Sequence, residues 1–391
     1  MQYFNFLSDS QKEDIFFKQP GAVTKDSPKH ILEYALGATL YIPGNRKDIA
    51  DMMIKQKYPE LCSVVFCLED SIGDCEVLQA ENNLVQQAEI IYQAHQLGNI
   101  TEDDLPLMFI RVREPEQMFE LGNKLGRALH LFTGFVFPKF STFNAERYLD
   151  TLSVLSKEAG ITLYGMPIFE TPDLLAMETR TKALQELKST LVFYQDVILN
   201  IRIGATDLCG LYGLRRKPQT SIYDIMVIAD FMKDIINYFG LQFVISGPVW
   251  EYFDNSVISL PSQAPYWETG TEPFNQYTNG LVRETLLDLA NGIHGKTVIH
   301  PSHLKTVQSL HVISIEDYLD ALSIVESADG TRGVMKSSFS NKMNEVKPHF
   351  SWANKILFKS EIFGVYHENR SYIDILTAKE KTFSNLGSYG S

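Results

Sequence analysis

The sequence contains few cysteines, and their spacing suggests neither a metal knuckle nor a disulfide framework. Its four cysteines are Cys62, Cys67, Cys75 and Cys209, and no two of them form a CxxC pair. Unpaired thiols beside apolar residues are typical of a reducing compartment. The first residues, MQYFNFLSDSQKED, lack both the basic stretch and the apolar core of a signal peptide. We therefore expect a cytoplasmic protein.

Positive charge and long hydrophobic runs are also scarce. The 35 Lys and Arg residues are outnumbered by 48 Asp and Glu residues, which gives a formal net charge of −13. A nucleic-acid partner would require a basic face, so we expect none. The sequence has no run of about 18 apolar residues, the length of a membrane-spanning helix, so we expect no membrane span either. A small anionic substrate remains compatible with this composition, because it needs only a local positive pocket.

The sequence does contain a regular alternation of short apolar runs and amphipathic stretches. Residues 145–160 and 219–240 carry apolar residues at helical spacing and end at glycine. Near-continuous apolar strands that alternate with helices predict a parallel sheet covered on both faces. The eight apolar runs are residues 38–44, 63–70, 105–114, 134–140, 162–170, 199–207, 242–250 and 295–301.

Eight such units predict a (β/α)8 TIM barrel over residues 38–310. An open doubly wound sheet is the alternative, but it would require a GxGxxG turn after an early strand, and none is present. Residues 1–37 are predicted to be an N-terminal extension across one end of the barrel. Residues 311–391 are predicted to be a C-terminal helical segment that ends in a frayed tail. Its helices are expected at 314–328 and 350–364, joined by a polar, flexible stretch.

Polar and ionisable side chains gather where the apolar runs end. Chemistry in a barrel of this kind lies at the C-terminal ends of the strands. Burying a lone charge is costly, so ionisable side chains within apolar strands normally have partners. Their presence at one end of nearly every run predicts a shared polar, anion-binding site there. In chain order these residues are Arg46, Glu69, Asp70, Arg111, Arg113, Lys139, Glu170, Asp207, Trp250 and His300.

Each of the acids also has a purely structural explanation. Glu170 could cap the helix that follows it. Asp207 stands between Gly204 and Gly210, and it could bond its own backbone in a turn. The functional alternative is that the two glycines let the chain turn sharply and aim Asp207 at a metal ion. Two acids after consecutive strands would then share that ion.

The basic residues have structural explanations as well. Lys139 and Arg46 could form salt bridges to Glu69 or Asp70, and both could still contact substrate. For His300 a structural hydrogen bond is favoured over catalysis. A Schiff-base mechanism through Lys139 would need a neutral, desolvated amine. With two acids one strand away, we expect this lysine to be charged and paired instead.

Several blocks together carry a family resemblance. LYIPGNR, FCLED, FIRVRE, FVFPKF, MPIFETP, IGATDL and GIHGKTVIHP resemble the citrate lyase beta-subunit-like family, part of the HpcH/HpaI aldolase group. The resemblance covers residues 39–305, extends more weakly to 365, and rests on the order and spacing of the blocks. It implies a (β/α)8 barrel that holds Mg²⁺, with Mn²⁺ as the alternative ion. The form resembles a long branch of the family encoded with tellurium-resistance genes.

The resemblance also implies roles for individual residues. Glu170 and Asp207 match the acids that bind the metal. Arg111 and Arg46 match arginines that hold a substrate carboxylate or polarise a carbonyl. The family's lid carries an acid that reaches the site of a neighbouring subunit in a trimer, and its nearest match is Glu345 in NKMNEVKPH. The C-terminal segment is therefore expected to be a lid and oligomerisation segment of a homo-oligomer, with a trimer favoured.

The remaining strand-end residues complete the predicted site. The catalytic candidates are Arg111, Glu345, Lys139, Glu69 and Asp70, with Arg111 facing the developing oxyanion and Glu345 moving the proton, or Glu69 or Asp70 in its place. For substrate binding the candidates are Arg46, Arg113, Trp250 and His300.

The chain departs from the family pattern in three places. Arg113 stands where the family usually has asparagine. The lid has glutamate for aspartate and one extra residue before Pro348. The loop at 251–280 is longer than the family norm, and its aromatic residues are Tyr252, Phe253, Tyr266, Trp267, Phe274 and Tyr277. These departures leave coenzyme A open as the substrate handle.

The leading prediction is a Mg²⁺-dependent carbon–carbon lyase. It would act on a 3-hydroxy-acyl or 2-oxo acid-derived substrate, either a carboxylate or an acyl thioester, through a metal-stabilised enolate. A malate synthase-like condensation with thioester hydrolysis could use the same metal site. A non-catalytic barrel that binds a metabolite or a partner protein through the aromatic loop is the alternative from a different class.

Overall fold

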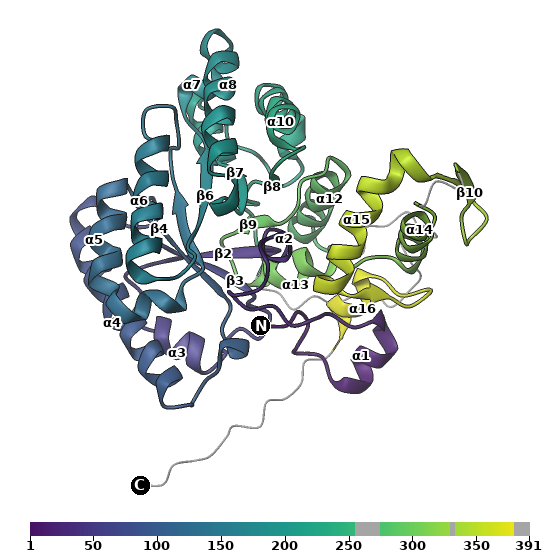
Figure 1. Ribbon diagram of the computed structural model, residues 1–391, viewed down its shortest axis with the longest axis horizontal. Coiled ribbons are helices and arrows are strands. Elements are labelled where there is room, and N and C mark those ends of the chain that lie inside the picture. Colours follow the sequence, from purple (N-terminus) through teal and green to yellow (C-terminus); the bar gives the residue numbers. More distant parts are fainter. Residues whose placement is uncertain (255–273, 329–332, 379–391) are drawn as a thin grey trace.

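The centre of the molecule is an eight-stranded parallel sheet that closes on itself (Figure 1). The structure is a computed structural model that describes residues 1–254, 274–328 and 333–378. The strand order is β8-β7-β6-β5-β4-β3-β2-β9, and a parallel bridge between Gly247 and Lys296 joins the two edges. The strands are β2 (Ala38–Pro43), β3 (Ser63–Cys67), β4 (Leu107–Arg111), β5 (Gly134–Phe137), β6 (Tyr164–Phe169), β7 (Asn200–Ile203), β8 (Val244–Ser246) and β9 (Lys296–Val298).

Helices surround this barrel and confirm the predicted (β/α)8 architecture, so the doubly wound alternative is wrong. Pro115 and Pro172 occupy the first positions of their helices, where a missing N–H costs nothing. Gly160 follows its helix in a left-handed conformation, a common C-terminal stop. The helices of the barrel are α3 (Ile49–Ile54), α4 (Val77–Gln96), α5 (Pro115–Leu125), α6 (Ala145–Ala159), α7 (Pro172–Leu175), α8 (Met177–Phe193), α9 (Ala205–Leu211), α10 (Met226–Phe239), α12 (Gln276–Ala290) and α13 (Ser302–Ser309).

Alternation along each strand separates the barrel interior from the surface that faces the helices. In β4, Met108 and Ile110 belong to the large core cluster under the helices, whereas Phe109 belongs to a second cluster inside the barrel. Because side chains alternate with a period of two, Arg111 at the end of β4 faces the interior as Phe109 does. The same period brings Arg202 of β7 to the barrel axis.

The N-terminal residues pack against the end of the barrel where the strands begin. This segment contains α1 (Asp9–Ile15), β1 (Phe16–Lys18) and α2 (Lys29–Leu32). Tyr3, Phe4 and Phe6 are fully buried and share the interior cluster with Phe109. Strand β1 pairs antiparallel with β12 (Val365–Tyr366), which ties the segment to the C-terminal part. The barrel axis is therefore filled with apolar side chains at this end.

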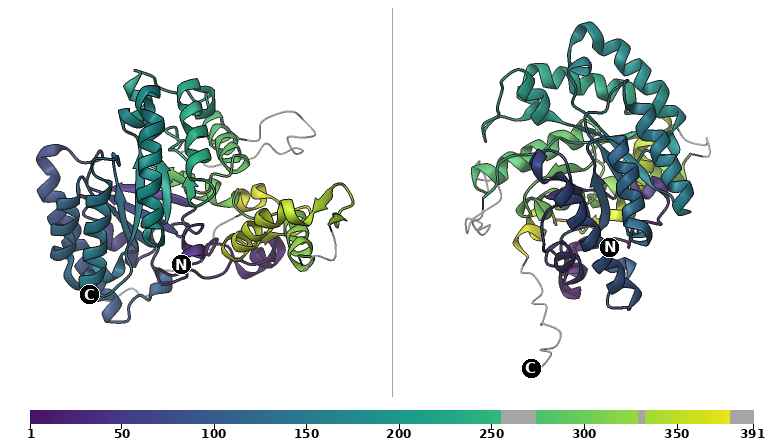
Figure 2. Two further views of the ribbon diagram at one scale, coloured as in Figure 1. Left: turned by 45° about the horizontal axis from the view of Figure 1, so that its top comes forward. Right: turned by 90° about the vertical axis from the view of Figure 1, so that its left-hand side faces the viewer.

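The C-terminal residues form a lobe beside the barrel, as Figure 2 shows from two further directions. The lobe contains α14 (Ile315–Glu326), β10 (Val334–Lys336), β11 (Met343–Glu345), α15 (Val346–Phe363), β12 and α16 (Tyr372–Thr377). The expectation of a flexible stretch up to residue 349 is wrong for its described part. Strands β10 and β11 pair as a hairpin, and α15 begins directly after it at the buried Val346. The predicted frayed tail at 382–391 lies outside the described residues.

No helix in the described part of the chain is both long and apolar enough to cross a membrane.

Candidate active site

A cavity of about 560 Å³ lies at the end of the barrel where the strands finish. This volume is within the roughly 300–1,000 Å³ of small-molecule sites. Four residues predicted from strand-end positions line it. The ionisable side chains of its wall include Asp70, Arg111, Glu170, Arg202, Asp207 and Glu251.

Glu170 follows β6 and is held in place by two backbone features. The N–H of Lys139 donates to its Oε1 at 2.8 Å. Gly204, at the end of the neighbouring strand β7, lies so close that a Cβ there would stand 2.0 Å from Glu170 Oε2. Burial raises the pKa of Glu170 to about 8, and the nearby charge of Asp207 adds to the effect. The ionised form of Glu170 would therefore be stabilised by a cation close by.

Asp207 lies in the first turn of α9, the helix that follows β7. The expectation of a glycine-framed turn is wrong, because Gly210 lies within α9 and neither Gly204 nor Gly210 has a positive φ. Glycine is required at 204 for the close approach to Glu170 rather than for a turn. Burial raises the pKa of Asp207, and the charge of Asp70 raises it further.

The pair of carboxylates fits a hydrated magnesium ion. Within the described residues neither Glu170 nor Asp207 forms an ion pair with a lysine or arginine, so their joint charge is left for another cation. Mg²⁺ prefers oxygen ligands and keeps several waters, so two carboxylates are a usual protein share. Among the residues that the structure describes, no group of three or more His, Cys, Asp or Glu side chains is arranged to hold a metal. An ion at this position would thus rely on the two acids and on water.

Arg111 and Lys139 are bound to a second pair of acids. Arg111 Nη1 lies 3.2 Å from Glu69 Oε2 and 3.4 Å from Asp70 Oδ2. Lys139 Nζ forms ion pairs with the same two side chains. Arg111 Nε and Nη2 also donate to Cys67 Sγ at 3.2 and 3.1 Å. The structural explanation for Lys139, a salt bridge to these acids, is therefore what the structure shows.

The charge state of Lys139 argues against a Schiff base. Burial alone would lower its pKa, but the hydrogen bond to Glu69 and the charges of Glu69 and Asp70 outweigh it, so the pKa is raised. A protonated amine is not a nucleophile. Lys139 also has φ +48°, a conformation that is uncommon for residues other than glycine. In this conformation the backbone N–H of Lys139 donates to Glu170, and the side chain of Lys139 forms an ion pair with Glu69.

Two predicted arginines do not line the cavity. Arg46 pairs with Asp48, with Nη2 and Oδ2 2.7 Å apart, and not with Glu69 or Asp70 as the structural alternative proposed. Arg113 donates to two backbone carbonyls in the loop after β3 and pairs with Asp74 at 2.6 Å. It therefore fastens that loop from outside the cavity.

Trp250 and His300 do not line the cavity either. Trp250 is 1% exposed and lies with its ring 5.4 Å from the guanidinium of Arg216. The ring of His300 stacks on Phe253 at 4.1 Å, and its Nδ1 is 2.8 Å from Ser302 Oγ. His300 thus makes the structural hydrogen bond that was favoured.

Glu345 lies on the surface of the C-terminal lobe, at the end of β11. All residues that line the cavity fall between positions 41 and 299, so Glu345 is not among them. In the aromatic loop, Tyr252 stacks on Tyr277 with ring centroids 6.1 Å apart. The predicted Tyr266 and Trp267 lie outside the described residues.

Several residues of the cavity wall were not predicted from the sequence. Arg202 stands within the apolar run LNIRIG, and a charge inside a buried strand is a signal that could have identified it. Its Nη2 donates to Thr297 Oγ1 at 2.7 Å. The ring of Tyr41 lies between Arg111 and Arg202, 5.4 and 5.5 Å from their guanidinium carbons. Arg215, at the exposed rim, also lines the cavity.

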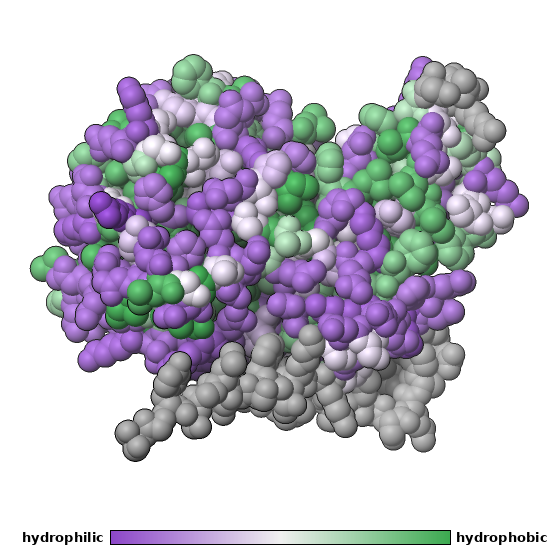
Figure 3. Space-filling view, turned by 60° about the horizontal axis from the view of Figure 1, so that its bottom comes forward, coloured by the Kyte–Doolittle hydropathy of each residue, from purple (hydrophilic) through white to green (hydrophobic). Residues whose placement is uncertain are grey.

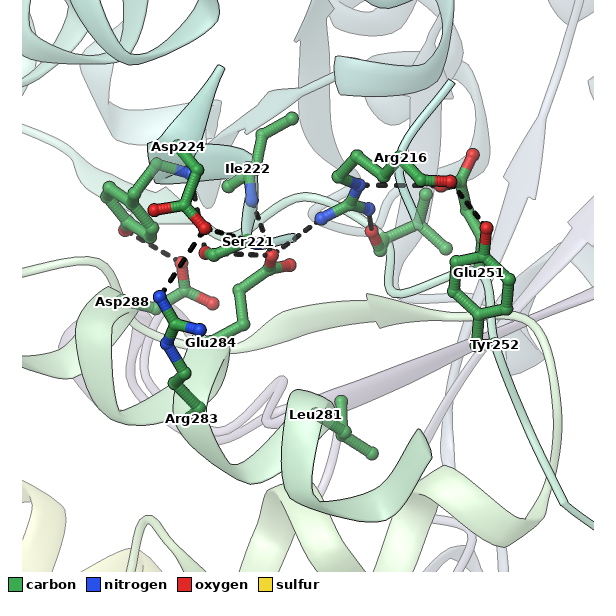
Figure 4. A network of polar contacts seen from close by, with 12 residues as sticks. Arg216, Ser221, Ile222, Asp224, Glu251, Tyr252, Leu281, Arg283, Glu284 and Asp288 are labelled. Atoms are coloured by element: carbon green, nitrogen blue, oxygen red, sulfur yellow. Dashed lines mark hydrogen bonds and ion pairs between the residues drawn. The ribbon is translucent and has the colours of Figure 1, made fainter. Parts of the chain in front are cut away.

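A second, buried ionic network holds the wall near Glu251 (Figure 4). Arg216 Nη1 donates to Glu284 Oε2 at 2.6 Å, and its Nε is 3.4 Å from Glu251. Lys296 of β9 pairs with Glu284 at 3.1 Å and with Asp288 at 2.7 Å, both on α12. The network links β9, α12 and the loop after α9, and so fixes that side of the cavity.

The family model of C–C bond lyases of the TIM-barrel fold matches residues 30–365. The chain belongs to this family. This match supports the carbon–carbon bond lyase class that the sequence blocks predict. No curated protein matches the chain.

Three solved structures illustrate the likeness. CitE from Mycobacterium tuberculosis, in complex with magnesium, acetoacetate and coenzyme A, shares 16% identity with a TM-score of 0.51, and the match covers 84% of this chain and 99% of CitE. This similarity shows the fold. Haloferax volcanii malate synthase, as a lead(II) complex, shares 14% identity over 70% of this chain and 72% of that chain, with a TM-score of 0.48. The M. tuberculosis citrate lyase beta subunit with oxaloacetate and magnesium shares 16% identity over 71% of this chain and 96% of that chain, with a TM-score of 0.42.

Proposed function

We propose that this lyase is Mg²⁺-dependent and acts on a 3-hydroxy-acyl or 2-oxo acid-derived substrate. It would break the carbon–carbon bond next to the hydroxyl-bearing carbon and release an oxo fragment. The observation that carries the proposal is the placement of Glu170 and Asp207 in one cavity with Arg111, where neither acid forms an ion pair with a Lys or Arg among the described residues. The magnesium and acetoacetate in the complex of CitE support the choice of ion and of a small oxo acid.

Each residue would have a defined task in this reaction. Glu170 and Asp207 would hold the ion, which supplies positive charge beside a substrate carbonyl as electrons move onto its oxygen. Arg111 offers a planar guanidinium suited to a carboxylate or an enolate oxygen. Its pairing with Glu69 and Asp70 orients it before substrate arrives.

Asp70 is this chain's own candidate for accepting a proton. Burial would raise its pKa, but the hydrogen bond with Glu69 and the charge of Arg111 outweigh burial and lower it, so Asp70 stays ionised. Burial raises the pKa of Glu69 instead. Two adjacent acids whose pKa values are driven apart are a usual acid–base arrangement. Asp70 also lines the cavity, where a substrate proton would be within reach.

We also propose that the C-terminal lobe completes the site of a neighbouring subunit. Glu345 is absent from the cavity wall of its own chain, so it would act only across a subunit boundary. The surface of the lobe carries exposed apolar side chains, including Val334, Phe339 and Met343, and Figure 3 shows apolar residues gathered on this lobe. Exposed apolar patches of this kind mark interaction surfaces. A homotrimer would bury them and bring Glu345 to a partner's cavity.

Magnesium binding and product analysis test the proposal. Isothermal titration calorimetry should show that Glu170→Gln and Asp207→Asn each weaken Mg²⁺ binding by at least about tenfold. Glu178→Gln, which removes an exposed acid of α8, is the matched control and should bind as the wild type does. Unchanged affinity in both site variants would refute the metal site.

Product analysis by mass spectrometry then separates the two reactions that one metal site could support. Cleavage of 3-hydroxy-acyl substrates into an oxo fragment supports the lyase. Condensation of an acyl thioester with a 2-oxo acid, followed by release of the thiol, would instead assign the malate synthase-like reaction. Coenzyme A thioesters and the corresponding free acids should be assayed side by side, because this comparison identifies the substrate handle.

A further inference from the structure

Arg202 lies deep in the catalytic cavity, inside the barrel. It is the third residue of β7, and its neighbours Ile201 and Ile203 belong to the core cluster under the helices. By alternation Arg202 points to the barrel axis. Only 1% of its surface is exposed, yet it forms part of the cavity wall. A guanidinium therefore occupies the floor of the cavity, two residues below the Gly204 that supports Glu170.

The contacts of Arg202 leave its charge without a counterion. Nη2 donates to Thr297 Oγ1 at 2.7 Å, and Nη1 lies 4.0 Å from Met166 Sδ. Nε is buried and has no hydrogen-bond partner in the part of the chain that the structure describes. The aromatic ring of Tyr41 lies 5.5 Å away. Within the described residues no Asp or Glu forms an ion pair with Arg202, although an unpaired buried charge is costly.

Other arginines with little exposed surface differ from Arg202 because they are paired with acids. Three of them have side chains that are at most 11% exposed, and each has two carboxylate partners. Arg202 is the exception, and burial lowers its pKa accordingly. The pairs are Arg111 with Glu69 and Asp70, Arg180 with Asp230 and Asp234, and Arg216 with Glu251 and Glu284.

The position of Arg202 relative to the proposed metal site indicates what its counterion is. The guanidinium carbons of Arg111 and Arg202 lie 5.4 Å and 5.5 Å from the centroid of the Tyr41 ring. Arg111 is the last residue of β4 and pairs with Glu69 and Asp70, whereas Arg202 lies within β7, is 1% exposed and has no acidic partner among the described residues. A ligand that engages Glu170, Asp207 and Arg111 at one end would extend its other end towards Arg202.

We propose that Arg202, with Tyr41 and Thr297, forms a carboxylate-binding subsite at the cavity floor. It would bind an anionic group of the ligand separate from the oxo acid end at the metal site, and so would select ligands with a second carboxylate. Arg202 is then a specificity-determining residue, and Thr297 fixes its orientation. This inference rests on the proposed function for the location of the other end of the ligand, but not for the anion subsite itself.

Matched ligand pairs test this subsite. In 2-oxoglutarate and 2-oxopentanoate the oxo acid end is the same, and only the first has a far carboxylate. Oxaloacetate and 2-oxobutanoate form the shorter pair. Calorimetry with Mg²⁺ should show that the wild type prefers the dicarboxylate of at least one pair by about tenfold or more, the worth of a charge-assisted hydrogen bond. Arg202→Met should abolish that preference and change monocarboxylate affinity by less than about threefold.

Arg215→Met is the matched charge control, because it removes an exposed cation from the same cavity. It should lower the affinity for both members of a pair alike, and more so at low salt. Loss of the preference in Arg215→Met but not in Arg202→Met would place the second carboxylate at the rim and overturn the proposal. So would an unchanged preference in Arg202→Met.

Two further measurements separate this proposal from its alternatives. Succinate binding in EDTA needs neither the metal nor an oxo group, so binding that depends on Arg202 supports the subsite even if the proposed lyase reaction fails. Thermal unfolding of the ligand-free protein tests the alternative that Arg202 has only a structural role. Arg202→Met should be at least as stable as the wild type, because it removes an unpaired buried charge. A clear drop in melting temperature, with no Arg202-dependent binding of succinate or of the oxo acids, would make the residue structural and end the proposal.

Discussion

A single methyl group at Gly204 should separate metal binding from folding. The added Cβ would stand 2.0 Å from Oε2 and 2.5 Å from Cβ of Glu170, far inside van der Waals contact. Gly204 has φ −87° and ψ 66°, so the backbone does not require a positive φ there and the effect of alanine is mainly steric. We expect Gly204→Ala to displace the Glu170 carboxylate at a cost of about 1–3 kcal/mol in stability. Mg²⁺ affinity should fall by roughly 10–100-fold, the usual loss when a group that orients a metal ligand is changed.

Gly210→Ala is the control for this substitution. It places the same methyl in α9, where nothing lies within 4 Å, so stability should stay the same or rise by up to about 1 kcal/mol. Calorimetric Mg²⁺ titration and thermal unfolding of both variants are the assays, with Glu170→Gln as the reference for a lost ligand. If Gly204→Ala binds Mg²⁺ as tightly as the wild type, Glu170 is not a ligand and the reasoning is wrong.

Three further predictions concern Arg111, the lobe and a buried lysine. Arg111→Lys should lower kcat by at least about 100-fold because lysine cannot offer a bidentate fork, and normal turnover would make Arg111 structural. Glu345→Gln should lower turnover by about 10²–10⁴-fold with Mg²⁺ affinity intact, and mixing it with Glu170→Gln subunits should restore activity; a monomer in light scattering would contradict this. Burial lowers the pKa of Lys359 to about 8, so between about pH 8 and 10.4 the native state binds fewer protons than the unfolded state and stability should rise with pH. Urea unfolding across this range should show no such rise in Lys359→Met, and an identical slope in both proteins would refute the assignment.

The barrel was predictable because its strands are buried on both faces. Each apolar run contains a strand of the sheet; the run at 63–70, for example, contains β3 at Ser63–Cys67. A strand that faces both the barrel interior and the helices is apolar at nearly every position, and this pattern is visible without tertiary information. Strand ends were therefore located to within a few residues, and Arg111 and Glu170 were placed at the correct end of the barrel.

Side-chain direction beyond the strand ends was not predictable. Arg111 and Arg113 are two residues apart, so a strand of normal period would point both into the cavity. Strand β4 ends at Arg111, however, and Arg113 belongs to the following loop, where the period no longer applies. Its guanidinium turns to the backbone of another loop instead. Arg202 shows the converse, because it lies within the strand and its direction follows from the alternation.

The hairpin of the lobe escaped sequence reasoning for a different reason. Strands β10 and β11 are three residues each, and their exposed positions carry no apolar alternation. Such short strands are specified by pairing with each other and by packing on α14 and α15, which a local pattern does not reveal. The helix α15 was expected from residue 350, but its first turn includes Pro348, a residue that the helical period does not identify.

The filled lower end of the barrel determines the direction from which a ligand reaches Arg202. Tyr3 and Phe4 belong to the apolar cluster that fills the axis, and Met166 of the same cluster touches Nη1 of Arg202. Arg202 thus marks the boundary between this apolar filling and the polar mouth. A ligand would enter from the polar mouth, where Asp70, Asp207 and Arg215 line the cavity, so the group that reaches the floor is the one farthest from the end held at the mouth. Because the oxo acid end is the one proposed to bind at the mouth, the second carboxylate of a substrate with charge at both ends would be the group that reaches Arg202, and this would fix the orientation of the substrate.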